Sequence, residues 1–405
     1  MAVNPPAGEH SSVGEVFRVF LRLGVTAFGG PVAHLAFFHD EFVKRRRWLD
    51  ESAFADLVAL CQFLPGPASS QFGFAVGLRR AGWSGALAAW AGFTLPAAAV
   101  MILLALGAVR FGGIANAGWL HGLKLATVAV VAQAVWTMGS RLCRGWGQLL
   151  LALAATNVVL AWSSAWAQVV VIGVAAAAGR RLFRSDLPSG AGEAPAEPSR
   201  RWESAPVLIF LGLLLLLPVL ATAFPGGWLQ QFDRFYRAGA LVFGGGHVVL
   251  PLLQGAVVTP GLVSPDEFIA GYGLAQSLPG PLFTFAGYLG TVAHSASNGW
   301  IGGLWCLVAV FLPGLLLVAG SLPAWERLRQ APGLRAALQG ANAAVVGLLL
   351  AALVSPIASG TLRRPADWCV AALGLAGLNW LKLPAWLIVA TCAAVGWVLG
   401  KIPGG

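Results

Sequence analysis

One unusual pattern occurs twice in this chain, and no other feature constrains the fold as strongly. The first copy is RLGVTAFGGP at residues 22–31, followed by QFLPGP at residues 62–67. The second copy is RAGALVFGGG at residues 237–246, followed by QSLPGP at residues 276–281. The first motif recurs after 215 positions and the second after 214, so one inserted or deleted residue separates the copies. The chain is therefore expected to contain two copies of one structural unit.

The composition indicates a membrane protein. Hydrophobic residues make up 58% of the chain and charged residues only 10%, whereas soluble domains carry about 25% charged residues. Several of the 17 Trp residues lie near the ends of apolar runs, which is typical of a membrane interface. The net charge of +10 does not indicate a nucleic-acid partner, because the basic residues lie in loops that border apolar segments. The pattern predicts an all-α polytopic membrane protein.

The apolar runs define the predicted crossings and domains. A cytoplasmic tail (1–12) precedes a first transporter repeat (13–180), and a Pro- and Gly-rich cytoplasmic linker (181–206) leads to a connecting transmembrane segment (207–231) and a second repeat (232–405). Nine runs are predicted to cross the membrane as helices: 83–109, 115–139, 146–161, 163–180, 204–223, 299–320, 334–356, 366–380 and 384–400.

The repeated motifs interrupt four further segments, at residues 13–44, 52–79, 232–256 and 266–294. An arm of about 12 residues rises about 18 Å, roughly half of a 30 Å hydrocarbon core. Each segment is therefore predicted to be a re-entrant hairpin, and the alternative is a broken helix that crosses completely. The positive-inside rule prefers hairpins, because only these leave the KRRR cluster at residues 44–47 in the cytoplasm. Both alternatives place an odd number of crossings between equivalent points, so the repeats are predicted to have inverted topology.

At these motifs the sequence resembles the chromate ion transporter family in its long-chain, two-domain form. The matching stretches are FGGP at residues 28–31, VKRRRWL at 43–49, QFLPGP at 62–67 and their echoes in the second half. The resemblance extends from about residue 14 to residue 400 and implies a multi-pass protein of the cell inner (plasma) membrane that exports chromate, with sulfate as a similar anion. One departure is Gly246, which stands where the first copy has proline.

The glycine–proline breaks suit an oxyanion. A tetrahedral dianion that leaves water needs hydrogen-bond donors and positive charge. Pro67 and Pro281 suit the first helical position, so the N–H groups that follow are free at a helix start, where anions bind. The alternative is that glycine and proline only kink packed helices. The residues expected to bind the substrate near the breaks are Gly29, Gly30, Gly66, Gly244, Gly245, Gly280, Gln62, Gln276, Ser69, Ser70 and Thr284.

Two arginines occupy equivalent positions in the copies. Arg22 and Arg237 could supply two positive charges to a dianion, with planar guanidinium groups that suit oxyanion oxygens. Arginine at mid-membrane costs roughly 2.5–3.5 kcal/mol or more, so it usually faces a cavity or a partner. The alternative is that both side chains reach the membrane interface, which nearby Arg18 and Arg234 favour. Asp233 could pair with Arg237 and lower its availability.

Other polar residues are candidates for accessory roles. Lys124 and Asn342 lie at approximately matched positions of apolar segments, and Asp56 lies inside a motif segment. His247 and His34 flank the glycine-rich tips, where a lone histidine is more often a packing residue than a proton carrier.

The membrane potential and the small number of carboxylates within the membrane segments favour export. Expelling an anion from a negative interior is favourable, whereas import needs coupling ions, and carboxylates that could relay protons are few. The alternative is a sulfate or oxyanion importer, or an anion exchanger. No HExxH, GxSxG or GxxxxGK[ST] motif is present, so we expect no enzyme activity, no nucleotide-driven pump, no catalytic residue, no metal and no cofactor. The expected partners are the transported anion and the lipid bilayer, and a homodimer stays open.

Overall fold

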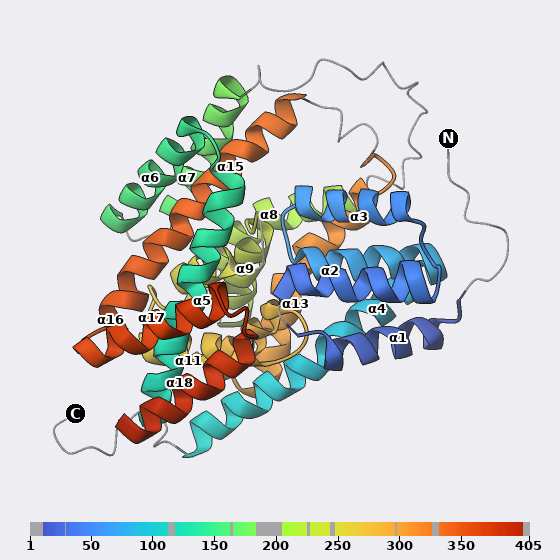
Figure 1. The fold of residues 1–405 in the computed structure, drawn as a ribbon. Coiled ribbons are helices and arrows are strands. Elements are labelled where there is room, and N and C mark those ends of the chain that lie inside the picture. The colour runs from blue at the N-terminus through green and yellow to red at the C-terminus, as the bar shows by residue number, and fades with distance from the viewer. Residues whose placement is uncertain are drawn as a thin grey trace.

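A computed structural model describes residues 11–28, 30–111, 118–162, 165–183, 205–224, 227–243, 248–295, 298–325 and 332–399. These ranges are mostly helical and contain no strand, which confirms the predicted all-α class for the described part of the chain (Figure 1). Within these ranges, five helices are long and apolar enough to cross a membrane.

The helices of the first half and its connection follow in chain order. They are α1 (Val13–Thr26), α2 (Gly30–His39), a π-helical turn (Asp40–Arg45), α3 (Glu51–Phe63), α4 (Ala68–Phe111), α5 (Gly118–Leu142), α6 (Trp146–Ala161), α7 (Ala165–Leu182) and α8 (Ala205–Ala223).

The second half contains a similar series. It comprises α9 (Gly227–Ala240), α10 (Val249–Val257), α11 (Pro265–Ser277), a 3₁₀ turn (Leu282–Thr284), α12 (Phe285–Val292), α13 (Gly299–Ser321), α15 (Pro332–Ala352), a π-helical turn (Leu353–Ala358), α16 (Ser359–Thr361), α17 (Pro365–Asn379) and α18 (Ala385–Leu399).

Each predicted crossing coincides with a described helix. The five membrane-length segments are α5, α8, α13, α4 and α15 with its continuation to Thr361. The backbone leaves the helical conformation at Ala81 and Gly82 of α4 and at Ser355 after α15. The other runs form α6, α7, α17 and α18, and whether these cross the membrane stays a prediction. The helix α9 begins at Gly227, before the predicted start of the second repeat at residue 232. Most of the predicted linker lies outside the described residues.

Local sequence signals fix where equivalent helices begin. Asp50 caps α3 by accepting a hydrogen bond from the Ala53 amide at 2.7 Å. Ser264, the equivalent residue of the second half, caps α11 in a capping box with Glu267. Such caps satisfy amides that have no partner inside the helix. The two halves therefore start the helix before each Leu-Pro-Gly-Pro break in the same way.

Small residues let equivalent helices approach closely. The helix α1 packs along α4, and α9 packs along α13. A Cβ added at Gly24 of α1 would meet the backbone oxygens of Gly92 and Phe93, and one added at Gly239 of α9 would meet that of Val310. Small residues at helix interfaces allow this backbone contact in membrane proteins. Equivalent residues therefore make equivalent contacts in the two halves.

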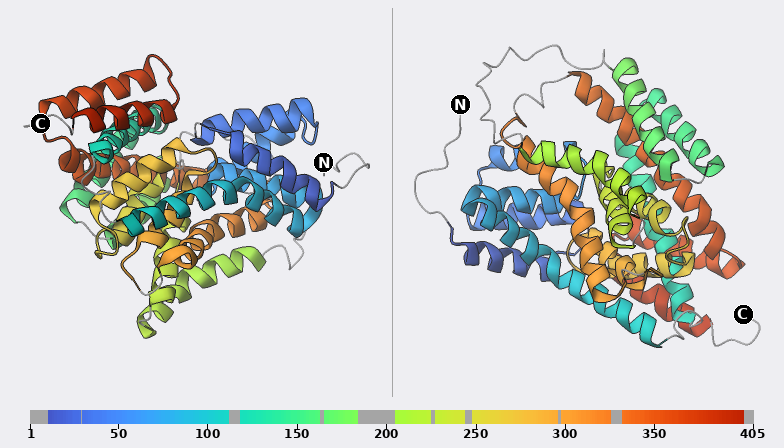
Figure 2. Two further views of the ribbon diagram at one scale, coloured as in Figure 1. Left: turned by 90° about the horizontal axis from the view of Figure 1, so that it is seen from below. Right: turned by 180° about the vertical axis from the view of Figure 1, so that it is seen from behind.

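The two halves also interlock at their far ends. The second-half helices α17 and α18 pack against α5, while the first-half helices α6 and α7 pack against α15 (Figures 1 and 2). Helices α1–α4 form a second group beside this assembly, and α9 and α13 lie between the groups (Figure 1). Helices of each half therefore pack against a long helix of the other half.

Candidate functional site

The two Leu-Pro-Gly-Pro breaks are each bonded to the opposite half. The Gly66 N–H donates to the carbonyl of Val242 at 2.7 Å, and the Gly280 N–H donates to the carbonyl of Ala27 at 3.0 Å. Val242 and Ala27 are equivalent residues, each immediately before the Phe-Gly-Gly sequence of its half. The two hydrogen bonds are therefore equivalent, and they join the four broken segments in pairs across the halves.

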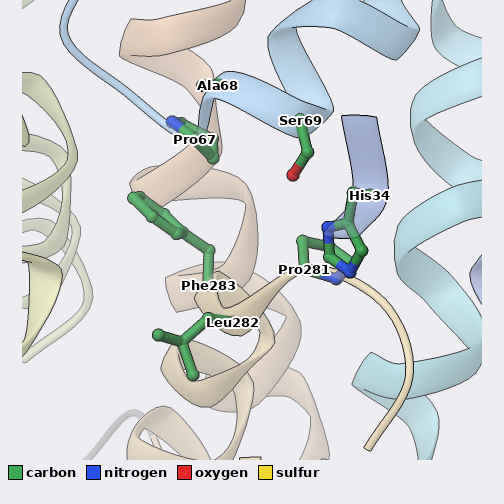
Figure 3. A pocket seen from close by; sticks show the side chains of 7 residues that line it. All are labelled: His34, Pro67, Ala68, Ser69, Pro281, Leu282 and Phe283. Carbon is green, nitrogen blue, oxygen red and sulfur yellow. The ribbon is translucent and has the colours of Figure 1, made fainter. Parts of the chain in front are cut away.

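A small pocket lies where the breaks meet, and we call it the junction pocket. Its volume is about 10 Å³, which is room for about one water molecule. His34 from α2, Ser69 from the start of α4 and Pro281 from the second break surround it (Figure 3). The complete lining is His34, Pro67, Ala68, Ser69, Pro281, Leu282 and Phe283.

Both breaks require glycine. Gly66 has a φ of 127° and Gly280 has a φ of 95°, a region in which other residues are strained. A Cβ on Gly66 would lie 2.9 Å from the Cα of Gly314, and one on Gly280 would lie 3.2 Å from the Cβ of Ala97. The close neighbour at each break is therefore a helix of the protein, and contact of these glycines with the anion stays a prediction.

The hydroxyl groups at the breaks differ in availability. Ser69 and Ser70 are 4% and 1% exposed, and the Ser70 hydroxyl has no hydrogen-bond partner among the described residues. Thr284 donates to the carbonyl of Pro281 at 3.0 Å and so stabilises its own turn. The start of α4 is therefore the break with a spare hydroxyl and free helical amides.

The predicted glutamines do not line the junction pocket. Gln62 is exposed, and Gln276 is half-buried and hydrogen-bonds Tyr272. The amide at the break belongs to Gln71, which donates to the carbonyls of Pro65 at 2.9 Å and Gly314 at 3.0 Å. Gln71 was not predicted from the repeat, because Phe285 occupies its position in the second half. Its place four residues after Pro67, one helical turn into α4, is the signal that could have found it.

His34, for which the sequence favoured a packing role, lines the junction pocket. Its side chain is 1% exposed, and its Nε2 lies 3.2 Å from the Ala27 carbonyl. The Nδ1 atom has no hydrogen-bond partner among the described residues. A residue expected to serve packing therefore carries a free polar atom beside the junction pocket.

The two predicted arginines lie in different settings. Arg22 is exposed and lines a groove of about 360 Å³ on α1 with Glu15, Arg18, Val19, Glu41 and Arg46. Arg46 is held in this groove by ion pairs of 2.7 Å to Glu15 and to Glu41. Arg237 pairs with Asp233, as the sequence allowed. Neither arginine lines the junction pocket, and a joint role at one anion stays a prediction.

The accessory candidates also have defined positions. Lys124 on α5 forms a 2.6 Å ion pair with Asp266 on α11, so it joins the two halves. Asn342 is half-buried in α15 and Asp56 is half-buried in α3. Gly30 begins α2 with a φ of 77°. The remaining candidates, Gly29, Gly244, Gly245 and His247, lie outside the described residues.

A helical, apolar chain whose two halves each contain a broken helix pair, with the breaks meeting in the interior, has the architecture of a membrane transporter. The protein belongs to the chromate transporter family, whose family model matches residues 14–180 and again residues 229–397.

Relatives of similar length support this assignment. The chain is 29% identical to a chromate transport protein of Pseudomonas aeruginosa, over 98% of this chain and 94% of the relative. It is 26% identical to a chromate transport protein of Cupriavidus metallidurans, over 95% and 92% of the two chains. It is also 27% identical to an uncharacterized transporter of Methanocaldococcus jannaschii, over 91% and 89%. No solved structure matches the chain.

Proposed function

We propose that this protein exports chromate from the cytoplasm across the inner membrane, driven by the membrane potential. Membership of the chromate transporter family supports chromate as the transported anion. The observation that carries the location of the site is the pair of equivalent hydrogen bonds that joins the breaks, Gly66 N–H to Val242 and Gly280 N–H to Ala27. These bonds converge on the free helical amides and hydroxyls at the start of α4, which are groups that bind oxyanions.

The proposed path follows from inverted repeats. The segments α1–α2, α3–α4, α9–α10 and α11–α12 each contain a predicted break. We propose that each segment turns back at its break and that equivalent segments of the two halves re-enter the membrane from opposite sides. Their tips then meet near mid-membrane, where the junction pocket lies. The match of one family model to each half supports two copies of one unit. Substrate sites at a repeat interface, built from broken helices, are the usual solution in such transporters.

The junction pocket must widen for transport. A volume of about 10 Å³ holds one water molecule but not a tetrahedral oxyanion with four oxygen atoms. Equivalent helices of the two halves are packed unequally: α10 and α11 contact α5, α7, α15 and α18, whereas α2 and α3 pack chiefly on α4. We propose that α2 and α3 are the part that moves, since fewer neighbouring helices contact them.

Cationic residues would draw the anion towards this path. Arg18 and Arg22 lie one helical turn apart in the α1 groove, and their guanidinium groups form no ion pair among the described residues. We propose that Arg22 contacts the anion first and that Arg237, whose charge Asp233 balances, contributes later in the cycle. The other proposed contacts are backbone amides, side-chain amides and hydroxyls at the breaks, with Lys124, Asn342, His247 and Asp56 in accessory roles.

The membrane potential is sufficient to drive export. Each negative charge that leaves a negative interior gains about 2.3 kcal/mol per 100 mV. A doubly charged chromate ion would gain about 4.6 kcal/mol per 100 mV, enough for a gradient on the order of a thousandfold. No coupling ion is required on this account.

Inside-out vesicles test the proposal. With an imposed interior-positive potential, the purified protein should drive chromate accumulation, and excess sulfate should compete if both anions use one site. Flux that ignores the potential but requires an anion on the opposite side would identify an exchanger and contradict this proposal. No chromate flux in either direction would contradict the assigned substrate.

A further inference from the structure

His34 is fixed in one orientation at the junction pocket. Its Nε2 lies 3.2 Å from the carbonyl oxygen of Ala27, the same oxygen that accepts the N–H of Gly280. The ring also packs edge-on against Phe93, at 5.3 Å between centroids and 86° between planes. Through the shared carbonyl, the imidazole of the first half is tied to the break of the second half. A movement of the second break relative to the first half would therefore disturb the contacts of His34.

The shared carbonyl also fixes which nitrogen carries the proton. A carbonyl oxygen only accepts hydrogen bonds, so Nε2 must be the protonated nitrogen and must donate. In a neutral imidazole, Nδ1 is then an acceptor with a free lone pair. This atom has no partner among the described residues, and the side chain is 1% exposed. A buried acceptor of this kind is costly unless a ligand or water donates to it.

No charged group among the described residues lies near the His34 ring. The elements around it contribute the rings of Phe38 and Phe93, the Ser69 hydroxyl and the apolar or proline residues of the two breaks. None of these lining groups is ionised at neutral pH. A fully deprotonated oxyanion presents only acceptor oxygens, which a neutral Nδ1 would repel. An oxyanion with one O–H group would instead donate to it.

We infer that His34 Nδ1 accepts the proton of a singly protonated tetrahedral oxyanion, so that the form transported is hydrogen chromate. This inference rests on the proposed function and specifies the cargo. No covalent bond to oxygen other than O–H is involved: the proton stays on the anion or passes to Nδ1, and in both cases the complex carries one proton and one net negative charge. The charge moved for each chromate is then one rather than two.

The same geometry discriminates between oxyanions of equal shape. Hydrogen chromate and chromate coexist near neutral pH because hydrogen chromate is a weak acid. Sulfate and selenate are the anions of strong acids and carry no proton at that pH. A site built around a hydrogen-bonding partner strongly rejects an analogue that lacks it. The equivalent residue in the second half is Val249, so among the described residues His34 has no equivalent histidine at the junction.

The test compares chromate with selenate in inside-out vesicles that contain the full-length protein. At neutral pH the wild type should transport chromate at least about tenfold faster than selenate, with one charge moved for each chromate. Raising the pH at constant total chromate should slow the flux as hydrogen chromate disappears. The His34→Gln variant, whose amide can turn either a donor or an acceptor to the pocket, should bring the chromate-to-selenate ratio close to one.

A matched control lies on the same helix. His39 is partly exposed and hydrogen-bonds Glu51 at 2.9 Å, so His39→Gln should leave the ratio unchanged. Two charges moved for each chromate, or an unchanged ratio in His34→Gln, would overturn the inference while leaving chromate export intact. Absence of chromate flux in the wild type would instead contradict the proposed function, so the two failures are distinguishable.

Discussion

Gly66 packs against Gly314 so closely that a Cβ on Gly66 would lie 2.9 Å from the Gly314 Cα. The equivalent contact in the other half, Gly280 against Ala97, leaves 3.2 Å between a new Cβ and the Ala97 Cβ. The first break therefore has less free space than the second, although the two are related by the repeat. We therefore expect a substitution at Gly66 to be more damaging than the same substitution at Gly280.

Alanine substitutions at the two breaks should reduce chromate export to different extents. We expect Gly66→Ala to abolish chromate export and Gly280→Ala to reduce it less. Both residues have positive φ, but a Cβ on Gly66 would lie 2.9 Å from the Gly314 backbone, whereas a Cβ on Gly280 would have its nearest backbone atom, the Phe93 oxygen, at 3.3 Å. The strain should cost about 1–3 kcal/mol at each site. Chromate flux per membrane-inserted protein measures the effect. Gly173→Ala in α7, where an added Cβ meets nothing within 4 Å, should behave as the wild type. Equal, full activity in both break variants would contradict close packing at the junction.

Substitution of Arg22 and substitution of Arg237 should have different effects on membrane abundance and on export. Asp233 is 3% exposed at its side chain and pairs with Arg237, so Arg237→Ala would leave a buried carboxylate unpaired, at a cost of about 3–5 kcal/mol. We expect this variant to lose membrane abundance, and Asp233→Asn with Arg237→Gln to restore it. Arg22→Ala should keep its abundance and lose export, since Arg22 lies in an exposed groove. Immunoblots and flux assays would show the reverse pattern if Arg22 were structural.

The side-chain amide of Gln71 should stabilise the packing at the first break. Gln71 joins the carbonyls of Pro65 and Gly314, and Gln71→Met preserves the side-chain length but removes both donors. Leaving buried carbonyls unsatisfied should lower stability by about 1–3 kcal/mol and reduce export. The shift in melting temperature of detergent-purified protein measures the first effect. No change in either quantity would show that water replaces the amide.

Inverted topology can be tested at matched loop positions. Lys44 and Thr259 are 215 residues apart and are both exposed. In a background without the five native cysteines, Lys44→Cys should react with membrane-impermeant reagents only from the cytoplasm and Thr259→Cys only from outside. Labelling from one common side would refute inversion while leaving the internal repeat intact.

The sequence predicted the breaks but not how they meet. Glycine and proline act locally, so the ends of α3 near Pro65 and of α11 near Pro279 could be read from the residues themselves. The bond from Gly66 to Val242 joins residues far apart in the chain. Such a pairing depends on how α4 and α13 pack, and no local pattern encodes it.

The polar residues at the site show a second limit. Comparison of the two copies directs attention to residues that recur, and Gln71 and His34 do not, since Phe285 and Val249 replace them. Conversely, Arg22 and Arg237 do recur, yet one lines a groove with two glutamates and the other pairs with Asp233. Symmetry in the sequence therefore predicts the backbone breaks of the candidate site and not the polar side chains that line it.

A density map of the protein with chromate bound would test the central claim most directly. The account predicts an anion between the start of α4 and the second break, within hydrogen-bonding distance of Ser69 and His34, in a junction pocket wider than in the structure described. Density for chromate only in the α1 groove beside Arg22, with the junction still closed, would contradict it.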